Sequence, residues 1–513
     1  MHHLIEIVEK RPAAVFAAFL ALHVAVWTAL PATLFLNLPL DLIEALTYGR
    51  EWQIGYDKLP PLPWWLVEIS YRLFGPDLFY YLLAQISVIA AFAAVWTVAQ
   101  QLVGRLGALV AILIIDGLHY FTFTAPKLNH DVVQLPFWAL AGCAYWFALR
   151  RGRMLHWVLL GLAVGISLWA KYFVVVLALP LALFTLFDRD ARKSLATPGP
   201  WIAVAVAALV MAPHLIWLFR NDFLPLQYVE ARAAFSRGLI DHILYPLQFA
   251  FGQIGFGLPA LLMAVPLIYP RDRTMPPAIA TDLDRRIVTV LAFGPAATVI
   301  ALSLFTGRGT VAMWGYPLWL FLGLWIVLVP ADALDRVRVG RVVTLWAIVF
   351  SGLVLAFIAD YTVVPELDHR YRAAFYPGDL IGAEASARFR ALTGRPLAYV
   401  VGTMWTGGNV SHYAPEHPRV LIDGSPRRAP WIDLGDLRAK GAIVIWDSGD
   451  PRTLPTRFRA VAEDAEVQEP FVLPFRRGDA RLTIGWAVLR PRPAMAGGDP
   501  FPPATTGATL PPR

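Results

Sequence analysis

Two carboxylates and a lysine stand close together in a polar stretch near the N-terminus. Asp41 and Glu44 are three residues apart, and Lys58 follows, with Tyr56 just before it and a Pro-Pro pair just after it. A carboxylate can take the proton from an incoming hydroxyl as general base, while an ammonium group stabilises the charge that develops on a departing phosphate. Proline fixes φ and can hold a neighbouring side chain in place. The pattern favours group transfer, and its alternative is an ordinary connecting loop.

Further polar and charged residues lie beside later hydrophobic stretches. Charges near or inside a bilayer are costly, so such concentrations are functional candidates by default. Two of them have an equally simple structural interpretation: Asp131 as a helix N-cap, and Lys171 as a side chain that snorkels from a helix end. The additional candidates are Asn129, His130, Asp131, Lys171, Arg232, Arg237 and Arg308.

The elements that must position these residues are membrane helices. Hydrophobic residues make up 57% of the 513 residues and charged residues only 16%, whereas soluble domains carry about 25% charged residues. A spanning helix needs about 20 mostly apolar residues. The sequence therefore predicts a polytopic α-helical membrane protein with about eleven spans, near residues 13–36, 79–102, 106–124, 132–149, 155–170, 172–187, 201–219, 244–269, 287–304, 310–330 and 342–359.

The distribution of Lys and Arg predicts the orientation of these spans. With the N-terminus in the cytoplasm, every inside connection is basic, and an odd number of crossings places residues 360–513 outside. The first hydrophobic stretch is too long for a signal peptide and lacks a cleavage pattern, so we expect a retained helix. The net charge of +7 then reflects membrane orientation and not nucleic-acid binding. The inside cations are Lys10, Arg11, Arg105, Arg150, Arg151, Arg153, Arg189, Arg192, Lys193, Arg271, Arg273, Arg285, Arg286, Arg336, Arg338 and Arg341.

The pattern changes after the last predicted span. An amphipathic segment ends at Gly394, and short apolar runs bounded by Gly, Pro and Asp begin near residues 396, 419 and 441, as buried strands do. With helices around 405–413 and 432–440, they predict a small α/β domain. We therefore divide the chain into a transmembrane domain (1–359), a periplasmic α/β domain (360–491) and a disordered Pro/Gly-rich tail (492–513).

Several classes of chemistry are disfavoured. The single cysteine, Cys143, lies within a hydrophobic segment, so neither a disulfide nor a thiolate metal site can form, and the histidines lack metal-ligand spacing. No Walker loop or GxGxxG motif occurs. Because no nucleotide reaches the outer side, we expect the activated donor to be carried by lipid, which favours a polyprenyl-phosphate sugar. The argument requires no metal, although several carboxylates beside a phosphate could recruit a divalent one.

The order of these motifs resembles glycosyltransferase family 39. Asp41 and Glu44 come first, then YDKLPPL, then NHD at residues 129–131, then WAKYFVVVLALP and TGRGTVAMWGYP. The family comprises GT-C membrane enzymes, including protein O-mannosyltransferases and bacterial lipid A aminoarabinose transferases. The resemblance covers about residues 10–330, and the C-terminal outer domain is similar to that of the aminoarabinose branch.

The resemblance implies roles for the acidic residues and for Lys58. Asp41 matches the family's first-loop carboxylate, which acts as catalytic base or orients the acceptor. The family usually has adjacent Asp-Glu there; Glu44 is separated, so it is a second catalytic candidate or a helix-surface charge. Lys58, with Tyr56 close by, is similar to the cation that meets the lipid phosphate, although Leu59 is inserted before Pro-Pro. Asp131 matches the second acidic position.

The resemblance also implies a set of donor and substrate contacts. Arg232, or Arg237 near it, occupies the position of a phosphate-binding arginine. Arg308 and Trp314 correspond to basic and aromatic positions before a proline, although the family more often has a tyrosine where Trp314 stands. Asn129, His130, Lys171 and Trp314 are the expected substrate contacts.

These observations together predict a glycosyltransferase of the bacterial inner membrane. It would transfer a sugar from a polyprenyl-phosphate donor to lipopolysaccharide, lipid A or another envelope glycolipid by a single inverting displacement on the periplasmic face. Three alternatives stay open: a protein acceptor, as for protein O-mannosyltransferases; a non-enzymatic lipid flippase or transporter; and a catalytically inactive scaffold of the same fold.

Overall fold

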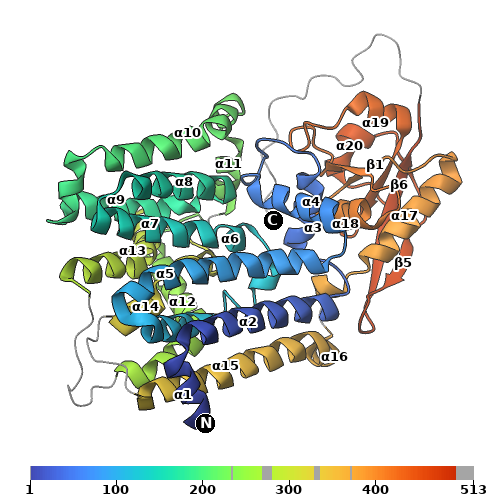
Figure 1. Cartoon of the computed structure of the whole chain (residues 1–513). Coiled ribbons are helices and arrows are strands. Elements are labelled where there is room, and N and C mark those ends of the chain that lie inside the picture. The colour runs from blue at the N-terminus through green and yellow to red at the C-terminus, as the bar shows by residue number, and fades with distance from the viewer. Residues whose placement is uncertain (1, 233–234, 269–279, 329–335, 370–371, 493–513) are drawn as a thin grey trace. The chain divides into compact units, whose positions relative to one another are not determined.

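The structure, a computed structural model, divides into two compact units, shown in Figure 1. The membrane unit comprises Met1–Phe35 and Trp52–Asp368, and the C-terminal unit comprises Leu36–Glu51 and His369–Arg513. The described residues are 2–232, 235–268, 280–328, 336–369 and 372–492, without the side chains of 2–5, 229–232, 268 and 336. Arg271, Arg273, most of the predicted tail (493–513) and the side chains of Arg232 and Arg336 therefore lie outside the described residues.

Seven helices in the described part of the membrane unit are long and apolar enough to cross a bilayer. The predicted multi-helix membrane fold is thereby confirmed. These helices are α2 (Pro12–Leu34), α5 (Leu78–Asp116), α6 (His130–Val133) continued by α7 (Leu135–Arg151), α10 (Gly199–Arg220), α12 (Asp241–Ile268), α13 (Asp282–Thr306) and α15 (Arg336–Thr362). Shorter apolar helices are α8 (Met154–Ala170) and α9 (Val175–Phe187), which follows η2 (Tyr172–Val174).

Short elements connect the apolar helices of this unit. They are α1 (His2–Lys10), α4 (Leu62–Phe74), η1 (Ala125–Lys127), η3 (Ala191–Ala196), α11 (Leu224–Arg232), η4 (Ala312–Gly315), α14 (Leu322–Leu328) and α16 (Val364–Asp368). Most of the candidate site residues lie in or beside these short elements, where the backbone leaves the regular helices.

Helix α5 is interrupted at Gly104, whose φ of 70° and ψ of 173° are not helical. A straight helix of its 39 residues would be about 58 Å long, about twice the hydrocarbon thickness of a bilayer. Glycine adopts positive φ without steric cost, which accounts for the position of the break. The break falls between the two spans that the sequence predicts at 79–102 and 106–124, although the second half ends at Asp116 and is followed by turns.

The prediction of one continuous helix over residues 310–330 is wrong. In the described part, η4 is followed by turns, and regular helix begins only at Leu322. Pro317 lacks an N–H and disfavours helical geometry at the preceding residue, so it breaks a segment that hydrophobicity alone would make helical. The irregular backbone brings Trp314 into the candidate site described below.

Helices α8 and α10 pack closely through two glycines spaced four residues apart. A Cβ at Gly161 would stand 2.4 Å from the carbonyl oxygen of Ala203, and one at Gly165 would stand 2.8 Å from Cβ of Val210. Small residues at this spacing let two apolar helices approach closely. This contact sets the position of the C-terminal end of α8, where Lys171 lies, against α10.

A buried polar network joins α2, α5 and α15 in the interior of the unit. His23 Nδ1 lies 2.8 Å from Asp116 Oδ1, and Trp346 Nε1 donates to Asp116 Oδ2 at 2.7 Å. Gln85 Oε1 lies 3.1 Å from the other ring nitrogen of His23. An acidic residue inside an apolar helix is costly unless it is paired. Asp116 is paired, so we assign it to packing and not to the reaction.

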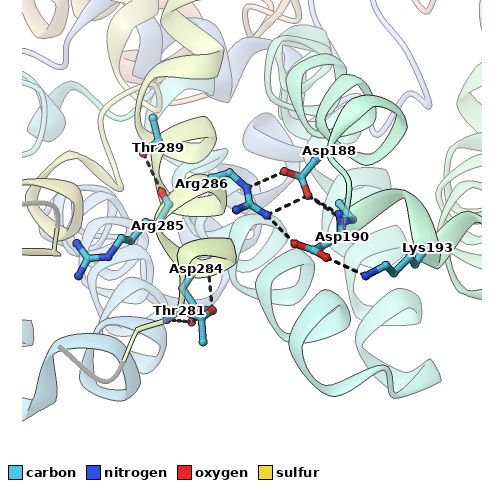
Figure 2. A network of polar contacts seen from close by, with 9 residues as sticks. Asp188, Asp190, Lys193, Thr281, Asp284, Arg285, Arg286 and Thr289 are labelled. Atoms are coloured by element: carbon cyan, nitrogen blue, oxygen red, sulfur yellow. Dashed lines mark hydrogen bonds and ion pairs between the residues drawn. The ribbon is translucent and has the colours of Figure 1, made fainter. Parts of the chain in front are cut away.

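Figure 2 shows a second polar network, at the N-terminal end of α13. Arg286 donates to Asp188 Oδ2 at 2.7 Å and to Asp190 Oδ2 at 2.9 Å, and Lys193 donates to Asp190 Oδ1 at 2.9 Å. The two aspartates lie in the connection between α9 and α10. The network therefore ties that connection to α13.

The start of α13 is held by its own cap and by α7. Thr281 and Asp284 form a capping box, which satisfies backbone N–H groups at the helix start. Asp284 also accepts from Trp146 Nε1 at 2.8 Å and lies 3.0 Å from Arg150 Nε. Arg285 donates to the carbonyl oxygen of Leu328 at 2.9 Å. One short segment thus joins three helices at a face where the sequence predicts cytoplasmic connections.

The C-terminal unit contains a mixed six-stranded sheet of order β2-β1-β3-β6-β4, with β5 also paired to β6. Strands β1 to β3 are parallel, and α18 and α19 connect them; β6 runs antiparallel to β3. The elements are η5 (Ala373–Phe375), α17 (Gly378–Thr393), β1 (Tyr399–Gly402), α18 (Met404–Tyr413), β2 (Arg419–Ile422), α19 (Leu434–Lys440), β3 (Ala442–Trp446), α20 (Thr456–Ala462), β4 (Glu466–Val467), β5 (Phe471–Pro474) and β6 (Arg481–Leu489). The predicted helix ending at Gly394 and the three predicted strands are confirmed.

The N-terminal segment 36–51 folds as part of this C-terminal unit. Its helix α3 (Leu40–Gly49) packs on α18, where Gly408 faces Ile43 and Thr47. Arg50 donates to the carbonyl oxygen of His417 at 2.7 Å, and Glu51 accepts from Arg419 Nε at 3.1 Å. The first predicted outer loop is therefore a helix held by the α/β unit, a pairing across more than 350 residues that no local pattern predicts.

We expect Arg286→Met to lower the melting temperature of detergent-solubilised protein by a few degrees at pH 7. Burial alone would raise the pKa of Asp188, but hydrogen bonds from Arg286 and from the backbone N–H groups of Ala191 and Asp190 outweigh it and lower that pKa. A carboxyl with a lowered pKa stabilises the fold above its unfolded pKa of about 3.9 and loses this contribution as pH falls. The difference between variant and wild type should therefore shrink below about pH 4. An unchanged difference at acid pH would contradict this assignment.

We expect Gly408→Val to destabilise the C-terminal unit. A Cβ at Gly408 would stand 2.6 Å from Ile43 Cγ2 and 2.8 Å from Thr47 Oγ1, so α3 must shift. Overpacking of this kind costs about 1–3 kcal/mol. Thermal unfolding measures it, with Gly352→Val as control, because a Cβ at Gly352 meets no atom within 4 Å. Equal melting temperatures for the two variants would argue against the packing of α3 on α18.

Candidate functional site

A nearly buried ion pair occupies the centre of the candidate site in the membrane unit. Lys171 Nζ lies 2.7 Å and 2.8 Å from the two carboxylate oxygens of Asp131, and the exposed fractions of the two side chains are 13% and 11%. Gln134 Nε2 also donates to Asp131 Oδ1 at 2.9 Å. The two groups thus compensate each other in surroundings where either charge alone would be costly.

Local sequence explains the position of Asp131. Asn129 is the N-cap of α6, and its side-chain oxygen accepts from the backbone N–H groups of Asp131 and Val132 at 3.0 Å and 3.2 Å. The cap residue is therefore Asn129, and the alternative in which Asp131 itself serves as N-cap is wrong. Asp131 lies in the first helical turn, where the helix dipole favours a negative charge.

Lys171 is fixed at the point where α8 ends. Its backbone is extended, with φ −162° and ψ 137°, and its N–H closes the last turn of α8 by donating to the carbonyl oxygen of Ser167. Its ammonium group lies 5.5 Å from the centroid of the Phe173 ring and 5.9 Å from that of Trp314. An ammonium near aromatic faces is stabilised by the ring quadrupole. Lys171 therefore contacts an internal carboxylate and two rings instead of extending to solvent.

Lys58 lies in the non-helical segment between residues 52 and 61. Its ammonium group stands 5.2 Å from the centroid of the Tyr228 ring on α11. Tyr56 is buried and accepts from the backbone N–H of Gln53 at 3.0 Å, and its ring packs edge-on against Trp64. Tyr56 thus shapes the segment from within, while Lys58 reaches α11, whose last residue is Arg232.

The remaining predicted cations lie farther along the chain. Arg308 stacks over the ring of Phe235 at 4.7 Å. Arg237 is 79% exposed, and its backbone N–H donates to Asp241 Oδ2 at 2.7 Å at the start of α12. The structure therefore brings Asp131, Lys171 and Trp314 together. Arg237 and Arg308 make the contacts with Asp241 and Phe235 that are described above. The roles of all these residues stay predictions.

Asp41 and Glu44 lie on α3 in the C-terminal unit. Asp41 is in the first turn and half-buried, whereas Glu44 is only 4% exposed. Glu44 is therefore not a surface charge, and that interpretation of it is wrong. The two acidic residues belong to the unit that carries the sheet, while Lys58, Asp131 and Lys171 belong to the membrane unit.

Sequence reasoning missed two side chains that contact the predicted site. Gln134 contacts Asp131, and Phe173 contacts Lys171. The position of Gln134, a polar residue one helical turn after Asp131, could have indicated it. Aromatic residues are too frequent in this chain to single out Phe173. Tyr228, which contacts Lys58, belongs to the polar outer-face residues that the sequence indicated, although it was given no role. Within the described residues, no group of three or more His, Cys, Asp or Glu side chains is placed to hold a metal ion.

Comparison with known proteins points to one class. Residues 58–217 match the family described as dolichyl-phosphate-mannose-protein mannosyltransferase. The chain is 23% identical over 499 residues to the lipopolysaccharide core galacturonosyltransferase RgtB of Rhizobium johnstonii, covering 92% of this chain and 96% of that one. It is 31% identical over 191 residues to the undecaprenyl phosphate-alpha-4-amino-4-deoxy-L-arabinose arabinosyl transferase of Pseudomonas paraeruginosa, covering 33% of each.

A solved structure has a similar fold. ArnT from Cupriavidus metallidurans, bound to undecaprenyl phosphate, superposes with a TM-score of 0.59 at 15% identity, covering 93% of this chain and 98% of that one. This likeness concerns the fold. Other curated relatives match this chain over shorter stretches, and the chain spans less than half of their length.

The ion pair predicts a specific pattern in a double-mutant cycle. Asp131→Asn leaves Lys171 buried without its counter-charge, which lowers the free energy of unfolding by about 3–5 kcal/mol. Lys171→Met leaves Asp131 without its counter-charge, and we expect a similar loss of stability. The double variant removes both charges, so we expect it to regain most of the stability and none of the activity. Thermal unfolding and a transfer assay measure the two quantities. Additive losses of stability in the double variant would contradict a direct ion pair.

Proposed function

We propose that this chain, which is similar to lipopolysaccharide galacturonosyltransferases and aminoarabinose transferases, is a membrane glycosyltransferase of the GT-C type that transfers a sugar from a polyprenyl-phosphate donor to lipopolysaccharide or lipid A. The observation that carries this proposal is the Asp131–Lys171 pair. It lies, together with Lys58, inside the segment that matches the family. The near full-length match to a galacturonosyltransferase makes a uronic acid the first sugar to test.

We propose a single inverting displacement. Asp41 takes the proton from the acceptor hydroxyl, whose oxygen attacks the anomeric carbon of the donor sugar. The bond from that carbon to the phosphate oxygen breaks, and its electron pair stays on the phosphate. Lys58 compensates the charge that accumulates there, with Arg232 on α11 as the second cation and Arg237 or Arg308 as further candidates.

The Asp131–Lys171 pair has a different part in this scheme. Because both Asp131 oxygens already accept from Lys171 or Gln134, the carboxylate is poorly placed to take a proton from substrate. We propose that the pair presents one side of Lys171 to sugar hydroxyls, with Asn129 fixing Asp131 and with the Trp314 ring offering an apolar face. Glu44, buried on the helix of Asp41, would support that carboxylate.

The proposed topology places this chemistry on the periplasmic face of a bacterial inner membrane. We propose eleven crossings: α5 crosses twice because it breaks at Gly104, α8 and α9 cross once each, and the segment leading into α14 crosses once. Basic connections such as that of Arg150, Arg151 and Arg153 then lie in the cytoplasm. The C-terminal unit lies outside and carries Asp41. The reaction as written requires no metal.

Mass spectrometry of envelope glycolipids tests the function. In a strain whose only copy carries Asp41→Asn or Lys58→Met, we expect the acceptor to lose the mass of one sugar, since removing a general base or a phosphate-binding cation costs about 100-fold or more in rate. Asp222→Asn and Lys127→Met are matched controls and should leave the glycan profile unchanged.

The same measurement separates the alternatives. Loss of a sugar from a protein instead of a lipid would favour a protein acceptor. An unchanged glycolipid and glycoprotein profile in the Asp41→Asn strain, at wild-type protein levels, would refute the enzyme assignment and favour a transporter or scaffold.

A further inference from the structure

Two buried histidines bind backbone carbonyl oxygens on either side of Lys58. His214 Nδ1 lies 2.7 Å from the carbonyl oxygen of Ile54, and His130 Nε2 lies 3.1 Å from that of Pro60. The exposed fraction is 0% for His214 and 6% for His130. The segment between these two attachment points contains Lys58 and has no regular secondary structure of its own.

The geometry assigns the protons on both rings. A carbonyl oxygen can only accept, so His214 carries hydrogen on Nδ1 and His130 carries it on Nε2. The Nε2 atom of His214 lies 2.6 Å from the hydroxyl of Tyr172, which can donate to it. The neutral ring of His214 is then fully satisfied: it donates to the Lys58 segment and accepts from the residue that follows Lys171.

Packing around His214 supports the same attachment. The Trp217 ring stacks on His214, with centroids 5.6 Å apart, and Gly55 lies directly on that indole, since a Cβ at Gly55 would stand 2.2 Å from Trp217 Cε3. Only glycine permits this approach of backbone to ring. The Lys58 segment thus rests on α10 through one hydrogen bond and one backbone–indole contact.

The attachment at His130 is built in the same way. Its ring packs edge-on against Trp64, with centroids 4.9 Å apart, and Trp64 in turn packs against Tyr56 inside the segment. His130 directly precedes Asp131 on α6. The two histidines therefore connect the Lys58 segment with both parts of the chain that supply the ion pair. His130 precedes Asp131, and His214 bonds Tyr172, which follows Lys171.

We propose that His214 and His130 are positioning residues that hold Lys58 at the phosphate of the lipid donor by fixing the two carbonyl groups that flank it. This inference rests on the proposed function, in which Lys58 binds that phosphate. Neither histidine needs to touch the substrate. This gives His130 a role other than the substrate contact expected from sequence, and it gives His214 a role that sequence reasoning did not assign.

Conservative substitutions test the proposal, because asparagine and glutamine should have opposite effects at the two histidines; we call this the crossed pattern. The side-chain amide of asparagine overlays histidine Nδ1, and that of glutamine overlays Nε2. His214→Asn keeps the donor to Ile54 and His214→Gln loses it; His130→Gln keeps the donor to Pro60 and His130→Asn loses it. A lost hydrogen bond to a buried carbonyl corresponds to about a tenfold change in an equilibrium constant. We expect about tenfold weaker binding of undecaprenyl phosphate in His214→Gln and His130→Asn, and near wild-type binding in the other two.

A spin label provides a readout that does not depend on substrate. Ile54 is 46% exposed and bonds His214 only through its backbone, so Ile54→Cys in a Cys143→Ala background accepts a nitroxide on the segment itself. The label should become more mobile in His214→Gln and His130→Asn and stay immobilised in His214→Asn and His130→Gln. His242→Gln is the matched control, because it removes the donor to the carbonyl oxygen of Leu304, a bond that joins α12 to α13 and does not involve this segment.

The outcomes separate this inference from the function on which it rests. Equal mobility and equal lipid binding in the Asn and Gln variants of each histidine would overturn the positioning role. If the crossed mobility pattern appears but wild-type protein does not bind undecaprenyl phosphate, the attachment is supported and the proposed donor is wrong. Similar melting temperatures across the four variants would show that the effects are local and not a loss of fold.

Discussion

Backbone N–H and C=O groups outside the regular helices need hydrogen-bond partners, and this requirement constrains the structure of the membrane unit. An apolar helix satisfies its own N–H and C=O groups, whereas a segment that leaves the helix inside an apolar unit must find partners elsewhere. Buried polar side chains supply them here. His214 and His130 bind the carbonyls of Ile54 and Pro60, and Tyr120 and Gln253 both donate to the carbonyl of Ala312, at 2.7 Å and 2.9 Å.

The same segments carry two of the candidate site residues. Lys58 lies between two of the bound carbonyls, and Trp314 lies just after Ala312 in the irregular stretch that hydrophobicity alone would make helical. Regular helices supply rigidity, and the irregular segments supply several of the candidate site residues. Polar residues that seem misplaced in apolar spans, such as His214 and Gln253, are thereby explained as the partners of those segments.

The two ion-pair clusters described in this unit differ in their burial. The Asp131–Lys171 pair is nearly buried and compensated, so its value lies in holding a cation in a defined direction and less in net stability. The Arg286 network is more exposed, and its contribution is to tie α13 to the α9–α10 connection. The first can take part in the reaction, and the second keeps the helices in place around it.

The acidic and basic candidates belong to different units. Asp41 lies on α3, which packs on α18, so the C-terminal unit carries this candidate residue. Because α3 is close in sequence to the first membrane helix, the sequence alone predicts that the acidic pair is part of a loop between membrane helices.

Sequence alone determined the membrane class, the interruption between residues 102 and 106 and the first three strands of the C-terminal sheet, because hydrophobicity and turn chemistry act over a few residues. It also identified Asp131 and Lys171 as candidates, although not as a pair. Only the tertiary structure decided that they bind each other, that His214 holds the Lys58 segment and that α3 belongs to the C-terminal unit. These are contacts between residues 40 to more than 350 positions apart, and no local pattern encodes such distances.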